Sequence, residues 1–125
     1  MDPFARVRSV AQSSECRYKV GSILLRKGKV VGEATNSMKT HPIQFHWATK
    51  AGNPKAIHLH AEIHSLITCR EEYDTMIVAR VDKKGEFKIA RPCKICLGAI
   101  LASDVKHLYF TNEDGEWEYE EIRRN

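Results

Sequence analysis

Two short motifs, far apart in this chain of 125 residues, place strong demands on its fold. The first is HAE at residues 60–62, and the second is PCKIC at residues 92–96. Together they supply one imidazole, two thiols and a carboxylate, and each lies at the start of a segment with helical spacing of apolar residues. One imidazole and two thiolates satisfy a catalytic zinc site, which uses three protein ligands and leaves a fourth position for water. The motifs therefore predict zinc ligation by His60, Cys93 and Cys96.

Glu62 lies next to the predicted ligands but suits a different role. In a helix of 3.6 residues per turn it lies about 200° round from His60, so the two side chains cannot share a direction. Zinc lowers the pKa of a bound water from about 16 to about 7. A carboxylate beside that water is placed to move its proton. We therefore predict Glu62 as the general acid/base of the site.

The helix starts themselves favour this chemistry. The partial positive charge of a helix N-terminus lowers the pKa of a thiol, and Pro92 suits the first turn because its missing N–H costs nothing there. Two alternatives remain open for Cys93 and Cys96. A redox dithiol would leave the HAE motif unexplained. A purely structural zinc site would use the two thiolates with His60 and a fourth ligand such as His58.

The periodicity of apolar residues predicts an α/β fold. Helices are expected over residues 3–14, 60–72 and 93–103. Strands are expected in a hairpin over residues 18–35 and over residues 75–82, 87–90, 105–111 and 116–122. This order predicts one mixed sheet covered by helices, and the tight turn at residues 112–115 implies an antiparallel hairpin at the C-terminal end. Residues 36–59 are expected to form a long irregular loop of the kind that is usually functional.

Length, charge and the N-terminal residues limit the class of protein. We expect a single domain over residues 1–125, with no membrane segment and a cytoplasmic location, because no secretory signal or long apolar run is present. Ten of the twenty Lys and Arg residues but only three of the sixteen Asp and Glu residues lie in residues 1–55. This basic half suits an anionic ligand such as a nucleotide phosphate or a nucleic-acid backbone, although a solvated basic surface would look the same.

These motifs resemble those of the cytidine/deoxycytidylate deaminase superfamily, in which H-x-E and P-C-x-x-C mark zinc-dependent base deaminases. The likeness covers nearly the whole chain and is greatest to short phage- or bacteria-type proteins. It rests on SSECRYKVGSILLRKGKVVGEATN, LHAEIHSL and ARPCKICLGAILASDVKHLYFT. The resemblance implies a three-layer α/β/α sandwich around a mixed five-stranded sheet. It also implies that the protein forms a homo-oligomer. If the protein is encoded by a phage, its expected location is the cytoplasm of the bacterial host.

The resemblance also implies contacts to a small-molecule substrate. By position, Asn36 would contact the sugar hydroxyl and the backbone N–H of Ala61 would hold the base carbonyl. The base would lie over an apolar floor near Val20. His64 occupies a position where deoxycytidylate deaminases usually have asparagine, so sugar or phosphate recognition is expected to differ there. The antiparallel final hairpin is a second departure, because it is typical of free cytidine deaminases.

Two further sets of residues follow from the same resemblance. Some phage deoxycytidylate deaminases hold a second, structural zinc, for which the candidates here are Cys16, His41, His46 and His58. The candidates for a phosphate contact are Arg17, Lys19 and Lys39.

The expected activity is hydrolytic deamination of a cytosine nucleotide, and the best single substrate is dCMP, giving dUMP and ammonia. One alternative is deamination of free cytosine nucleosides, which needs no phosphate contact. Another is deamination of single-stranded nucleic acid, with Phe45 and Trp47 as stacking platforms. A zinc-stabilised binding module without activity would leave Glu62 with no role.

Overall fold

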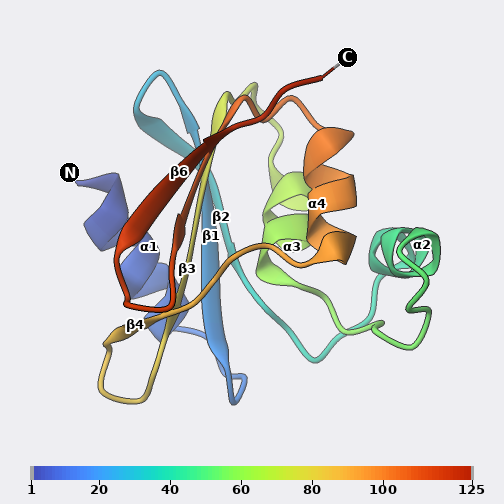
Figure 1. Ribbon diagram of the computed structural model, residues 1–125, viewed down its shortest axis with the longest axis horizontal. Helices are drawn as coiled ribbons and strands as arrows, with labels where there is room; N and C mark the ends of the chain where they lie inside the picture. Colours follow the sequence, from blue (N-terminus) through green and yellow to red (C-terminus); the bar gives the residue numbers. More distant parts are fainter. Residues whose placement is uncertain (1, 125) are drawn as a thin grey trace.

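A mixed β-sheet forms the centre of the molecule, and helices cover both of its faces (Figure 1). The structure, a computed structural model, describes residues 2–124, so the two end residues of the expected domain lie outside it. Its helices are α1 (Pro3–Gln12), α2 (Pro42–Lys50), α3 (Ala61–Thr68) and α4 (Lys94–Leu101). Its strands are β1 (Lys19–Arg26), β2 (Lys29–Thr35), β3 (Thr75–Val81), β4 (Phe87–Lys88), β5 (His107–Thr111) and β6 (Trp117–Glu121).

The strands are ordered β2-β1-β3-β5-β6, and the short β4 pairs with the end of β3. Strands β3 and β5 run parallel, whereas β1–β2, β1–β3, β3–β4 and β5–β6 are antiparallel. The turn between β5 and β6 contains Gly115, whose φ of 75° lies in the left-handed region that favours glycine. The mixed sheet and the antiparallel C-terminal hairpin expected from the sequence are therefore confirmed.

The two faces of the sheet pack against different helices, because successive strand residues point to opposite faces. In β1, Ile23 and Leu25 face α1, and Leu24 faces the opposite side. The core on the α1 side contains Val7, Val10, Ile23, Leu25, Ile77 and Ala79. The core on the other side contains Leu24, Met76, Val78, Ile100, Val105, Leu108 and Phe110. Figure 1 shows the resulting layers, with α1 on one face and α3 and α4 on the other.

Gly21 lets α1 lie directly against β1, and we expect Gly21→Ala to destabilise the protein. A Cβ at this position would lie 2.5 Å from the backbone nitrogen of Ala11, and backbone cannot rotate away as a side chain can. Overpacking of this kind costs about 1–3 kcal/mol of unfolding free energy. Urea denaturation measures the change, with Lys29→Ala on exposed β2 surface as the control that should stay near wild type. Wild-type stability for Gly21→Ala would show that α1 shifts without cost.

The expected irregular loop over residues 36–59 is wrong in its middle third, where α2 forms. Pro42 occupies the first turn, and Nδ1 of His41 accepts a hydrogen bond from the N–H of Ile43 as an N-cap. The helix buries Gln44 and Ala48. Figure 1 shows α2 beyond α3 and α4, on the side away from the sheet.

The third helix is also shorter than the expected range of residues 60–72. It ends at Thr68 because Cys69 adopts an extended conformation, with ψ of 126°. In the part of the chain that the structure describes, no helix has the length and apolar character needed to cross a membrane.

Candidate functional site

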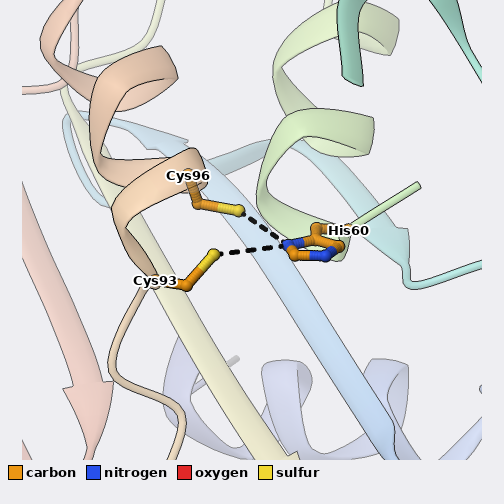
Figure 2. A group of neighbouring side chains, drawn as sticks. All are labelled: His60, Cys93 and Cys96. Atoms are coloured by element: carbon orange, nitrogen blue, oxygen red, sulfur yellow. Dashed lines mark hydrogen bonds between the residues drawn. The ribbon is translucent and has the colours of Figure 1, made fainter. Parts of the chain in front are cut away.

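His60, Cys93 and Cys96 come together where α3 and α4 begin. Figure 2 shows both sulfur atoms pointing towards the imidazole. Nδ1 of His60 lies 3.2 Å from Sγ of Cys96 and 3.6 Å from Sγ of Cys93. Within residues 2–124, this is the single group of three or more His, Cys, Asp or Glu side chains whose ligand atoms are close enough to hold one metal ion.

The donor set and its surroundings fit zinc. One imidazole nitrogen and two thiolate sulfurs are ligands that Zn²⁺ prefers, and a catalytic zinc keeps a fourth position open. Two of the three residues, His60 and Cys93, line a cavity of about 250 Å³. The cavity is lined by Val20, Asn36, His60, Ala61, Glu62, Ile89, Ala90, Arg91 and Cys93.

The arrangement of the two cysteines favours negative charge on the sulfur of Cys93. A hydrogen bond from the Cys96 thiol, with a smaller contribution from His60, lowers the pKa of Cys93 to about 4 against the opposing effect of burial. The same bond to Cys93, together with burial, raises the pKa of Cys96 well above its ordinary value. The Cys93 thiolate in turn raises the pKa of His60. The negative charge that zinc ligation requires is therefore favoured on the Cys93 sulfur.

Glu62 lies in the first turn of α3 and lines the same cavity. Only 6% of its surface is exposed, and burial raises the pKa of its carboxyl group. A carboxyl group with a raised pKa exchanges protons more readily near neutral pH, which suits a general acid/base.

Two buried serines fix α3 against the sheet. Oγ of Ser65 donates a hydrogen bond to the backbone carbonyl of Glu62 at 2.8 Å, and it lies 2.9 Å from Oγ of Ser22 on β1. Both serines are fully buried. The backbone that carries Glu62 is therefore tied to the central sheet.

Gln44 of α2 holds the HAE motif at its first residue, His60, and this role was not identified from the sequence. Its Oε1 accepts a hydrogen bond from the backbone N–H of His60 at 3.0 Å, and its Nε2 donates to the carbonyl of Ala56 at 3.3 Å. The side chain is fully buried. A glutamine inside a segment of weak helical pattern gives no sequence signal for this role, because its partners lie outside its own helix.

The structure places three of the expected substrate contacts, Asn36, Ala61 and Val20, around the cavity. Oδ1 of Asn36 accepts hydrogen bonds from Oγ of Ser14 at 2.6 Å and from the N–H of Val20 at 3.2 Å. Its Nδ2 donates to the carbonyl of Tyr18 at 2.6 Å. These bonds fix the orientation of the amide and leave one N–H of Nδ2 for another partner.

His64 does not line this cavity. Its Nδ1 lies 2.8 Å from the backbone carbonyl of Thr35, and the residue borders a separate cavity of about 470 Å³ between α1, β2 and α3. The helical turn explains the separation, because a residue two positions after Glu62 points to a different side of α3.

The expected phosphate contacts also lie outside the lining of the cavity. Nζ of Lys19 donates to the carbonyl of Ser14 at 2.5 Å, and the guanidinium of Arg17 lies 5.7 Å from the centre of the Tyr18 ring. Lys39 is exposed.

The four candidates for a second zinc site do not form a metal-binding group among the described residues. His41 caps α2, and His46 packs against Trp47 with the ring centres 4.9 Å apart. Sγ of Cys16 donates to the carbonyl of Asn36 at 3.5 Å. His58 is joined to Thr40 by an isolated β-bridge.

Comparison with known proteins agrees with this geometry. The family described as the cytidine and deoxycytidylate deaminase zinc-binding region matches residues 4–112. No curated protein matches the chain.

Several solved structures are similar. The dCMP deaminase of cyanophage S-TIM5 in apo form has 24% identity and a TM-score of 0.61, covering 89% of this chain and 81% of that one. Its complex with dCMP and dUMP has 25% identity and a TM-score of 0.60, covering 90% and 85%. RibD of Acinetobacter baumannii has 20% identity and a TM-score of 0.50, covering 86% of this chain but 26% of that one. Because the family match spans most of the chain and includes both motifs that meet at the cavity, the chain belongs to the cytidine and deoxycytidylate deaminase family.

Proposed function

We propose that this protein catalyses the zinc-dependent hydrolytic deamination of a cytosine nucleotide, with dCMP converted to dUMP and ammonia. One observation carries the proposal: the His60, Cys93 and Cys96 ligand atoms meet beside buried Glu62 at a single cavity. The choice of a nucleotide is supported by the similar cyanophage S-TIM5 enzyme, whose structure contains dCMP and dUMP.

In this proposal, His60, Cys93 and Cys96 hold the zinc, which when bound supplies a water that is acidic near neutral pH. Glu62 accepts a proton from the attacking water and passes it to N3 of the ring, and it then moves the remaining hydroxyl proton to the amino group, which leaves as ammonia. The raised pKa of Glu62 suits both transfers. Water and a cytosine ring thus become a uracil ring and ammonia.

Other residues at the cavity orient the substrate. The backbone N–H of Ala61, at the start of α3, has no partner within its own helix and is available to the base carbonyl. The remaining N–H of the Asn36 amide is available to a sugar hydroxyl, and Val20 contributes an apolar wall.

The alternative of a single-stranded nucleic-acid substrate receives little support from the expected stacking pair. Trp47 packs against α4, where a Cβ added at Gly98 would lie 3.0 Å from its ring. Phe45 is 52% exposed, so one of the two rings is available for stacking. A binding module without activity would have no use for a buried carboxylate beside the ligands.

Ammonia release from a panel of cytosine compounds tests the proposal. The panel includes cytosine, deoxycytidine, CMP, dCMP, dCTP and a short single-stranded oligonucleotide, each with zinc-loaded protein. We expect dCMP to give the highest kcat/KM. Equal kcat/KM for dCMP and deoxycytidine would contradict a nucleotide substrate, and release from none of the compounds would contradict deamination itself.

A further inference from the structure

Arg91 is the one cationic lysine or arginine side chain among the residues that line the cavity. It lies in the segment between β4 and α4, two residues before Cys93. We infer that Arg91 binds the phosphate of the substrate and so selects nucleotides over nucleosides. This inference rests on the proposed deaminase function and assigns the phosphate contact to a residue other than Arg17, Lys19 or Lys39.

Two contacts hold the guanidinium of Arg91 at the cavity. Its Nη2 lies 2.8 Å from Oε1 of Glu120 on β6, and its Cζ lies 5.2 Å from the centre of the Phe110 ring on β5. A guanidinium has five N–H donors in a planar fork. The ion pair with Glu120 occupies one nitrogen, so the contacts orient the group without using all of its donors.

The ion pair is weak enough to admit a phosphate. The Arg91 side chain is 53% exposed and that of Glu120 is 36% exposed, and ion pairs in contact with water contribute little. A phosphate offers several charged oxygens to the fork at once, which gives a shorter and stronger bidentate contact. A substrate phosphate can therefore bind Arg91 together with Glu120, or displace the Glu120 carboxylate from Arg91.

The surroundings of Arg91 favour a single anionic group over a chain of them. Arg91 also borders an adjoining cavity whose other charged residues are Glu113, Asp114 and Glu118. These carboxylates would repel the successive phosphates of a polynucleotide that continued past Arg91. The arrangement therefore suits a mononucleotide and does not suit a strand of nucleic acid.

Arg91→Gln tests the inference, with Arg26→Gln as its matched control. Arg26 is equally exposed, at 50%, and pairs with Glu72 at 3.2 Å. It lies at the opposite end of β1 from Val20, which lines the cavity. Each zinc-loaded variant is assayed with dCMP and with deoxycytidine, and calorimetry measures the binding of dUMP and deoxyuridine.

We expect Arg91→Gln to lower kcat/KM for dCMP by about 10- to 150-fold, the usual effect of losing a hydrogen bond between charged groups. Binding of dUMP should weaken by a similar factor. In Arg91→Gln, kcat/KM for deoxycytidine and the Kd of deoxyuridine should change by less than about twofold. In Arg26→Gln, kcat/KM for dCMP and deoxycytidine and the Kd of dUMP and deoxyuridine should all change by less than about twofold. Arg91→Lys keeps the positive charge but loses the planar guanidinium, so its kcat/KM for dCMP should lie between those of the wild type and Arg91→Gln.

Equal losses for dCMP and deoxycytidine would overturn the inference, because they would assign Arg91 a structural role. An unchanged preference for dCMP in Arg91→Gln would overturn it as well, while leaving the deaminase proposal intact. Failure of the wild type to release ammonia from either compound would instead contradict the proposed function, and the inference would fall with it.

Discussion

We expect the replacement of Glu62 with glutamine to abolish most of the proposed deamination while the protein stays folded. The amide has the size of the carboxyl group but cannot accept a proton and return it, and losing a general acid/base typically lowers kcat by about 10²- to 10⁴-fold. Steady-state ammonia release measures this loss. The zinc content should stay at the wild-type value, because the ligands are His60, Cys93 and Cys96 in our proposal.

The stability of Glu62→Gln separates a catalytic role from a structural one. Burial raises the pKa of Glu62, so the folded protein holds this carboxyl group at a cost when it is ionised. Glutamine removes that cost, and the Tm at neutral pH should therefore equal or exceed that of the wild type. Glu72→Gln, at a side chain 82% exposed, is the control and should retain full activity. Near-normal activity in Glu62→Gln, or a loss of zinc, would contradict the role we assign.

The parts of the site that the sequence predicted depend on neighbours along the chain. His60 and Glu62 belong to one helix start, and Cys93 and Cys96 belong to another, so their spacing alone indicates how each pair is presented. The antiparallel hairpin of β5 and β6 follows in the same way from one short turn. In each case, residues close together in the sequence were sufficient for the prediction.

The parts that the sequence did not reveal depend on partners far along the chain. Helix α2 was missed because its buried positions are Gln44 and Ala48 while Phe45 is exposed, so the apolar residues do not repeat with a helical period. Gln44 gains its role only through the backbone of His60, which lies outside α2. Arg91 likewise depends on Glu120 and Phe110, which belong to the C-terminal hairpin.

Cys96→Ser should lower zinc affinity by more than about 100-fold, since losing a residue that merely supports a ligand already costs about 10- to 100-fold. Cys96 is fully buried and packs in the cluster between α2, α3 and α4. A metal held by His60, Cys93 and Cys96 would join the starts of α3 and α4. In wild-type protein, zinc at a thousandfold excess over its Kd adds about 4 kcal/mol to the free energy of unfolding. For a protein of this size, this raises the Tm by roughly 10–20 °C. We expect a chelator to remove this increase from the wild type and to change the Tm of Cys96→Ser little.

The zinc stoichiometry of these proteins also tests the second metal site. Because Cys16, His41, His46 and His58 do not form a metal-binding group among residues 2–124, we expect one zinc per chain in the wild type. Cys16→Ser should then keep both its zinc and its Tm, whereas Cys96→Ser should lose its zinc at the same free concentration. Elemental analysis after dialysis measures both. Two zinc ions in the wild type, with one lost on Cys16→Ser, would show instead that binding draws the segment before α3 and Cys16 together around a second ion.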